Sequence, residues 1–434
     1  MTEELGQQPR RDFLGRSIIG TGAALAGLWE GTAMLEGAPA ALLAADAEAD
    51  SLPATALNMI GAYGQWAASI VGDQPARLSF RQPQFQDLAA WRAEARQRVA
   101  DCLAPPPQQS LVDARVDSSE ELDGLQVEQV SWQLPYGPRT KAVVLKPANA
   151  RGKLPAVVGL HDHGGNKFFG LDKITRSGSA QHPLMARHQD GYYGGRPWAN
   201  ELAKRGYVVL VHDTFSFASR KVRMQDVSPA ALSDVSPVED DSESSIIAYN
   251  RWAAGHEHLM AKSLFSAGTT WPGVFLGEDQ RAVDYLCGRP DVDPSRVGCA
   301  GLSGGGLRTV YLGGMDDRIR CACCVGMMTT WRDYLLHKCH THTWMIYIPL
   351  LPRDLDYPEI LALRAPAATL VLNDLEDSLF TVGEMRRADE MMRAIFDKAG
   401  AADRYRCTFY PGPHKFDVPM QREAFDWFDQ WLKG

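Results

Sequence analysis

Short apolar segments alternate with segments of mixed polarity along most of the chain. Leu154–Leu160 is apolar almost throughout, which is typical of a parallel strand buried on both faces. Helical segments such as Glu278–Leu286 separate several of these runs. The alternation predicts an α/β fold with a mostly parallel, doubly wound sheet and flanking helices. The predicted strands lie near Gln126–Leu134, Thr140–Lys146, Leu154–Leu160, Gly206–Asp213, Val297–Leu302, Ile319–Met327, Ala367–Asn373 and Tyr405–Tyr410.

The region before these strands has a helical pattern instead. Asp87–Leu103 is strongly amphipathic, and the prolines at positions 105–107 end it. We therefore expect an N-terminal helical extension over residues 46–110 and an α/β domain over residues 111–434.

The first 45 residues have the features of an export signal. Arg10 and Arg11 precede Phe13 and a short Gly/Ala-rich apolar stretch, which resembles a twin-arginine signal. The stretch is too short and too weakly apolar to span a membrane, and Glu30 interrupts it. We expect cleavage near residues 40–47 and a periplasmic or secreted protein without a stable membrane span.

The composition adds two constraints. The chain has 434 residues, 45% hydrophobic and 23% charged, with a net charge of −8, which is typical of a globular protein with a large core. This mild acidity, without a basic cluster, argues against nucleic acid as a partner. The eight cysteines do not form the pattern of a disulfide framework. We expect the cysteines to be buried and to pack as small hydrophobic residues. A metal or redox site at Cys321-x-Cys323 and a single disulfide are the alternatives.

The strand that ends at Leu302 continues directly into Ser303 and a helical segment. The sequence around Ser303 is G-x-S-x-G, and this strand–turn–helix pattern is that of a nucleophile elbow. Glycines two positions away on either side relieve crowding at such a turn. A Walker A loop would end in Lys followed by Ser or Thr, and a dinucleotide-binding loop would have the pattern G-x-G-x-x-G with an acidic residue about 20 positions later. The segment around Ser303 has neither pattern. Ser303 is therefore the candidate nucleophile, with the Gly304 N–H as one candidate oxyanion donor.

A candidate base and a candidate acid follow in the order that this chemistry requires. His414 lies after Pro411-Gly412-Pro413, between the last predicted strand and an amphipathic final helix. Three carboxylates follow the strand Ala367–Asn373, namely Asp374, Glu376 and Asp377. We prefer Asp377, because a few residues of turn let its carboxylate return towards the histidine, where it would orient the imidazole.

The strand Leu154–Leu160 ends in a histidine- and glycine-rich loop. His161-Asp162-His163-Gly164-Gly165 is similar to the H-G-G loop that supplies a second oxyanion donor. We expect that donor to be the backbone N–H of His163 or Gly164. A metal site at His161 and His163 is the less favoured alternative, since alternation along a strand places both on one face.

Together these motifs give the chain a resemblance to the α/β-hydrolase superfamily from about residue 110 onward. It looks most similar to the acetyl xylan esterase and dienelactone hydrolase branch. The segment from Asn373 to Phe380 resembles that branch's N-G-x-x-D-x-L-F, which also assigns the acid role to Asp377. The chain departs from the pattern at Asp374, where a glycine is usual. The resemblance implies a serine hydrolase that needs no cofactor and no metal.

Two long insertions are expected to shape the substrate cleft. They run from Asn166 to about Gly194 and from Thr214 to about Thr270. Trp331 and Trp344 are candidates to stack on a substrate, with packing roles as the equally weighted alternative. The close spacing of His337, Cys339, His340 and His342 raises the less favoured alternative of a metal site.

The sequence thus predicts an exported serine hydrolase that cleaves carboxylic esters through Ser303, His414 and Asp377. Acetyl or other small acyl esters of carbohydrates are the substrate that the resemblance favours. An amide or lactone hydrolase with the same triad is the alternative. A non-catalytic binding protein is a third possibility, disfavoured because such proteins typically lose the serine or the histidine.

Overall fold

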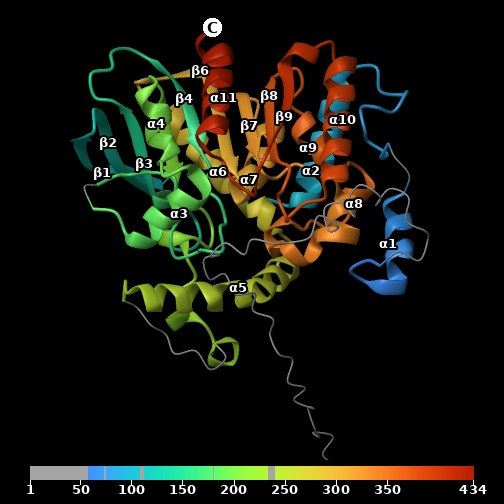
Figure 1. Cartoon of the computed structure of the whole chain (residues 1–434), viewed down its shortest axis with the longest axis horizontal. Coiled ribbons are helices and arrows are strands. Elements are labelled where there is room, and N and C mark those ends of the chain that lie inside the picture. Colours follow the sequence, from blue (N-terminus) through green and yellow to red (C-terminus); the bar gives the residue numbers. More distant parts are fainter. Residues whose placement is uncertain (1–56, 73–74, 108–111, 179, 233–239) are drawn as a thin grey trace, which may run out of the picture. The chain divides into compact units, whose positions relative to one another are not determined.

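The computed structural model describes residues 57–72, 75–107, 112–178, 180–232 and 240–434, and the predicted export signal lies outside them. These residues contain the strands shown in Figure 1. Their bounds are β1 Val112–Leu122, β2 Leu125–Gln133, β3 Thr140–Pro147, β4 Leu154–Gly159, β5 Val208–His212, β6 Val292–Leu302, β7 Ile319–Val325, β8 Ala368–Asp374 and β9 Tyr405–Tyr410.

All of these strands belong to one sheet, in the order β1-β2-β3-β5-β4-β6-β7-β8-β9. The pairs β1–β2, β2–β3 and β3–β5 are antiparallel, and the pairs from β5–β4 to β8–β9 are parallel. The carboxyl ends of β4, β6, β7 and β8 therefore meet at one edge of the sheet. The predicted mostly parallel α/β architecture is confirmed.

Helices cover both faces of this sheet, and the sheet separates two hydrophobic cores. Side chains of α2, α6, α7, α9 and α10 contribute to one core, and side chains of α3, α4 and α11 to the other. Alternation along β3 serves both, since Ala142 and Val144 face the first core and Val143 and Leu145 the second. The helix bounds are α1 Gly64–Val71, α2 Leu88–Leu103, α3 Pro183–Tyr193, α4 Trp198–Lys204, α5 Glu243–Ser266, α6 Trp271–Cys287, α7 Gly304–Met315, α8 Trp331–Asp333, α9 Tyr357–Ala362, α10 Val382–Lys398 and α11 Val418–Phe428.

The predicted helix Asp87–Leu103 corresponds to α2. The Asp87 carboxylate caps it by accepting hydrogen bonds from the N–H groups of Ala89 and Ala90. Buried residues at helical spacing, including Trp91, Ala95 and Val99, join the same core as α6 and α7. Among the described residues, no helix has the length and hydrophobicity needed to cross a membrane.

The two insertions contain helices rather than the long loops expected from the sequence. The first holds a 3-10 helix, Leu171–Lys173, and α3, and the second holds α5, a helix of 24 residues. Figure 1 shows α5 away from the strands, below the helices that cover the sheet. The insertions follow the carboxyl ends of β4 and β5, so both leave the sheet at that edge.

A buried ionic cluster attaches α7 to the elements around it. Arg308 of α7 donates to Asp279 of α6 at 2.5 Å and lies 2.9 Å from His212 Nε2 of β5. All three side chains are at most 1% exposed. Removing one partner of such a pair leaves an uncompensated buried charge, which is far more costly than removing both. The cluster therefore fixes α7, the helix that directly follows Ser303.

We expect Arg308→Met to lower the free energy of unfolding by about 3–5 kcal/mol, because Asp279 would remain buried without its cation. The double variant Arg308→Met/Asp279→Leu should regain much of that loss. Urea denaturation of the two variants and the wild type measures both values. A single variant within about 1 kcal/mol of the wild type would contradict this account of the cluster.

Candidate active site

Ser303 has the backbone geometry of a strained turn. It lies between β6 and α7 with φ 82° and ψ −106°, a region that residues other than glycine rarely adopt. Its N–H donates to the Val325 carbonyl of β7 at 3.0 Å, which holds the turn in place. Ser303 is half-buried. The sequence prediction of a sharp strand–serine–helix turn matches this geometry.

The glycines on either side of Ser303 are required by close packing. A Cβ at Gly301 or at Gly305 would clash with the Leu160 carbonyl oxygen at the end of β4. A Cβ at Gly304 would lie 2.7 Å from the His163 backbone nitrogen. The turn is therefore pressed against the loop that follows β4, and the Gly304 and His163 N–H groups lie near each other.

His414 and Asp377 are in direct contact. His414 Nδ1 lies 2.5 Å from Asp377 Oδ2, and the Asp377 side chain is fully buried. The other oxygen of Asp377 accepts the Leu379 N–H at 2.9 Å, which fixes the carboxylate. His414 Nε2 is buried and has no hydrogen-bond partner among the described residues. The ring therefore has one nitrogen bound to a carboxylate and the other available.

The ring of His414 lies beside the serine turn. It packs on Gly326, where a Cβ would lie 2.9 Å from both His414 Cε1 and Leu302 Cδ1. Gly326 directly follows Val325, whose carbonyl accepts the Ser303 N–H. The structure therefore places the His414–Asp377 pair beside the Ser303 turn, without a hydrogen bond between His414 Nε2 and a described residue.

The electrostatic environment of His414 favours its charged form. Burial lowers its pKa, but the hydrogen bond and charge of Asp377, with Asp374 and Asp162 further away, outweigh burial and raise it above the usual 6.5. A histidine of this kind holds a proton more readily than a free imidazole does. That property suits a base that must be stabilised once it is protonated.

Asp374 is a second buried carboxyl group next to this pair. One of its oxygens accepts the Lys415 N–H at 3.1 Å, and the other has no partner among the described residues. Burial raises the pKa of Asp374 to about 7, although the Lys415 N–H and the His414 charge oppose the shift. Asp374 does not contact His414 Nδ1, which Asp377 occupies. Glu376, the third candidate, instead accepts the Gly412 N–H.

The loop after β4 is held by buried charges that the sequence did not reveal. Lys173, in the first insertion, donates to the carbonyls of Asp162 and His163, both at 2.8 Å. Glu257, on α5 in the second insertion, binds the His163 side chain at 2.9 Å and Lys167 at 2.6 Å. Neither residue stands in a motif, so sequence reasoning had no signal for them beyond the insertions themselves.

The two candidate tryptophans differ in exposure. Trp331 is 4% exposed, and its backbone and indole N–H groups donate to Asp356 and to the Leu355 carbonyl. This favours the packing alternative for Trp331. Trp344 is 42% exposed, and its backbone N–H donates to Glu257, which also binds His163. Trp344 therefore remains the candidate for substrate contact.

The alternative metal sites have other contacts. Within the described residues, no group of three or more His, Cys, Asp or Glu side chains is arranged to hold a metal ion. His342 Nε2 lies 2.9 Å from the Leu379 carbonyl, and burial lowers its pKa to about 4. All eight cysteines are unpaired, and Cys299, Cys321, Cys323 and Cys324 lie in the cores.

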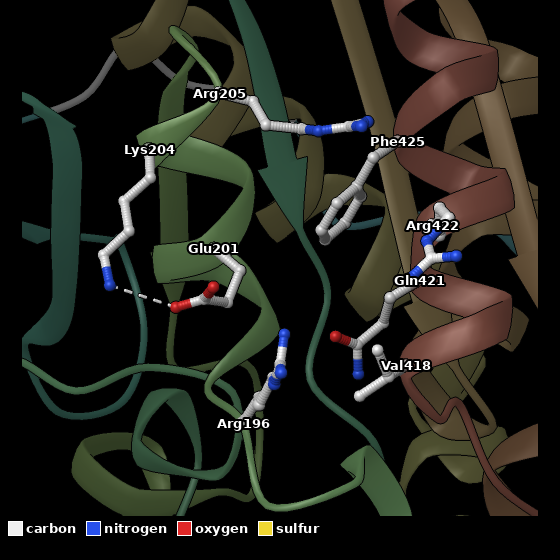
Figure 2. A pocket seen from close by; sticks show the side chains of 8 residues that line it. All are labelled: Arg196, Glu201, Lys204, Arg205, Val418, Gln421, Arg422 and Phe425. Carbon is white, nitrogen blue, oxygen red and sulfur yellow. Dashed lines mark hydrogen bonds and ion pairs between the residues drawn. The ribbon is translucent and has the colours of Figure 1, made fainter.

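A separate cavity of about 290 Å³ lies between α4 and α11. Figure 2 shows that basic side chains surround it, with Lys204 paired to Glu201 at its edge. The residues that line it include no serine, cysteine or histidine, so it lacks a nucleophile and a base. They are Arg196, Glu201, Lys204, Arg205, Val418, Gln421, Arg422 and Phe425.

The chain is similar to known proteins in sequence and in fold. No family model matches it. A curated protein named "Putative hydrolase YtaP", from Bacillus subtilis (strain 168), is 25% identical over 344 residues, which span 79% of this chain and 100% of that protein.

Two solved structures resemble this chain in architecture. A "putative acetyl xylan esterase" from Bacteroides fragilis has a TM-score of 0.59 and 16% identity, over 81% of this chain and 83% of that one. A glucuronoyl esterase from Solibacter usitatus has a TM-score of 0.58 and 15% identity, over 88% and 99%. With the sheet order above, these likenesses confirm the predicted α/β-hydrolase fold.

We expect the melting temperature of Asp374→Asn, relative to the wild type, to increase between about pH 4 and pH 7. The folded protein keeps the Asp374 proton up to a pKa of about 7, whereas the ordinary value is 3.8. Between these pH values Asp374 of the wild type releases a proton on unfolding, so the stability of the wild type falls as the pH rises. Asparagine does not titrate, so the variant lacks this fall in stability. Calorimetry across the range measures the difference, and a pH-independent difference would contradict the raised pKa.

Proposed function

We propose that this protein is a serine esterase that cleaves carboxylic esters through Ser303, His414 and Asp377. The observation that carries the proposal is the 2.5 Å contact between His414 and Asp377 beside the strained Ser303 turn. A nucleophile, a base and a group that orients the base are the three parts of this chemistry. The hydrolase and esterase names of the similar proteins support the same reaction class.

The reaction begins with proton transfer from the Ser303 hydroxyl to His414 Nε2 as Ser303 Oγ attacks the ester carbonyl carbon. The negative charge moves to the carbonyl oxygen, which the N–H groups of Gly304 and of His163 or Gly164 stabilise. His414 then gives its proton to the leaving alkoxide, and the acyl group stays on Ser303. A water molecule, deprotonated by His414, releases the acid in the second half.

The substrate that we propose is an acetyl or other small acyl ester of a carbohydrate. The similar proteins include a putative acetyl xylan esterase and a glucuronoyl esterase, both of which act on carbohydrate esters by name. Trp344 offers an exposed ring next to the loop after β4, where a sugar would stack. An amide or lactone remains the alternative substrate. Export through the twin-arginine pathway is also part of this proposal.

We expect a fluorophosphonate probe to label the wild type and not Ser303→Ala, because the probe reacts with an activated serine. Asp377→Asn should lower kcat by about 10³–10⁴-fold, since the imidazole loses its orienting carboxylate. Gel fluorescence and hydrolysis of acetyl, feruloyl, lactone and amide substrates provide the two measurements.

The matched controls are Asp374→Asn and Glu376→Gln, which alter the other two carboxylates of the same turn and should retain kcat within about tenfold. The acid assignment is wrong if Asp377→Asn keeps full activity while a control loses it. Folded wild-type protein that neither binds the probe nor hydrolyses any substrate would instead favour a binding protein.

A further inference from the structure

We propose that Lys173 is a positioning residue that orients and polarises the two peptide groups that serve as oxyanion donors. The inference rests on the proposed esterase function and adds a residue from the first insertion to it. Lys173 does not touch the reacting atoms, so its effect must pass through the backbone of the loop after β4.

The geometry links one ammonium group to two successive peptide groups. Lys173 Nζ donates to the Asp162 carbonyl at 2.8 Å and to the His163 carbonyl at 2.8 Å. The Asp162 carbonyl belongs to the same peptide group as the His163 N–H. The His163 carbonyl likewise belongs to the same peptide group as the Gly164 N–H. Lys173 therefore binds the carbonyl ends of both candidate donor groups.

The N–H ends of these groups are free to act. Neither the His163 N–H nor the Gly164 N–H donates a hydrogen bond to another described residue. The His163 nitrogen also faces Gly304, at whose position a Cβ would lie 2.7 Å from it. Gly304 opens α7, so its own N–H has no carbonyl one turn earlier. The His163 and Gly304 donors thus meet at the serine turn.

A cation on a carbonyl oxygen strengthens the N–H of the same peptide group as a donor. Electron density is drawn toward the oxygen, so the N–H becomes more positive, and hydrogen bonds along such a chain reinforce one another. The effect is largest where water is excluded. Lys173 is 0% exposed, and its ammonium lies 4.7 Å from the centre of the Phe217 ring. The ammonium therefore acts in a dry environment.

The charge of Lys173 is itself compensated. Its ammonium lies 3.9 Å from Asp162 Oδ2, and that carboxylate is hydrogen-bonded by His188 and Tyr193. Burial disfavours the Asp162 charge, but His188 and Lys173 outweigh it and hold the pKa of Asp162 below its ordinary range. Asp162 is therefore a buried counter-ion for the Lys173 ammonium, which a charge in this position requires.

The test uses Lys173→Met, which keeps an unbranched apolar chain but lacks the ammonium group, and Lys173→Arg, which restores a cation. Loss of a whole oxyanion donor lowers kcat by about 10²–10³-fold, so a weakened donor should lower it by about 10–100-fold. We expect that loss in Lys173→Met with KM within about threefold, and partial recovery in Lys173→Arg.

Two further readouts separate polarisation from a general loosening of the fold. Affinity for a trifluoromethyl ketone, which forms a tetrahedral oxyanion on the serine, should fall by the same factor as kcat/KM. The amide nitrogen resonances of His163 and Gly164 should move upfield in Lys173→Met. The amide measurement needs no turnover. If Lys173→Met is poorly folded, Lys173→Met/Asp162→Asn removes the unpaired carboxylate as well and replaces it in all measurements.

The outcomes distinguish the two proposals. Active wild-type enzyme together with a folded Lys173→Met variant that keeps kcat within about threefold would overturn the role of Lys173. A loss confined to KM would overturn it too. Wild-type protein without esterase activity would refute the proposed function, and the amide resonances would then decide alone whether Lys173 polarises the loop.

Discussion

The contact on which the site depends is the close packing of the Leu160 carbonyl oxygen against Gly301 and Gly305. Any side chain at either glycine would occupy the position of that oxygen. The contact joins the carboxyl ends of β4 and β6, which are neighbours in the sheet. It therefore sets the distance between the serine turn and the loop that begins at His161. The strained backbone of Ser303 persists because packing of this kind, with the Val325 hydrogen bond, leaves it no alternative.

Buried charges then place the groups around this contact. The ion pair between Arg308 and Asp279 attaches α7 to α6. Asp377 is hydrogen-bonded to His414, and Lys173 donates to the backbone of the loop after β4. Each of these ions has a partner, because an unpaired charge in such a position would destabilise the fold. The two insertions contribute part of this framework, since Lys173 lies in a 3-10 helix of the first and Glu257 in α5 of the second. Lys173 and Glu257 of these insertions contact the loop after β4, and whether the insertions also shape a substrate cleft stays a prediction.

The sequence was most informative where chemistry and local pattern coincide. The apolar runs predicted the bounds of the parallel strands to within two residues, because strands buried on both faces must be apolar, except that β6 begins at Val292, five residues before the predicted start. Asp377 could be chosen over Asp374 and Glu376 from the length of the turn, and the contact with His414 agrees with that choice. Whether Asp377 acts as the acid remains a prediction.

What the sequence did not reveal depends on tertiary contacts. β1 is an exposed edge strand with charged residues on both faces, so it has no apolar alternation to detect. α5 has a weakly amphipathic sequence, so the second insertion shows no clear helical pattern. Lys173 and Glu257 contact residues that are distant in the sequence or lie in other elements. The sequence around either residue contains no motif that would predict the contact. The sequence does not distinguish Trp331 from Trp344, whereas the structure shows that Trp331 is buried and Trp344 is exposed.

The central claim is that Ser303 forms a covalent acyl intermediate during ester cleavage. Rapid acid quenching of the enzyme during turnover of an activated acetyl ester, followed by peptide mass spectrometry, tests it directly. The account predicts one acetyl group on the peptide that contains Ser303, formed faster than steady-state turnover. An acetyl group on another residue, or turnover without any acylated peptide, would contradict it.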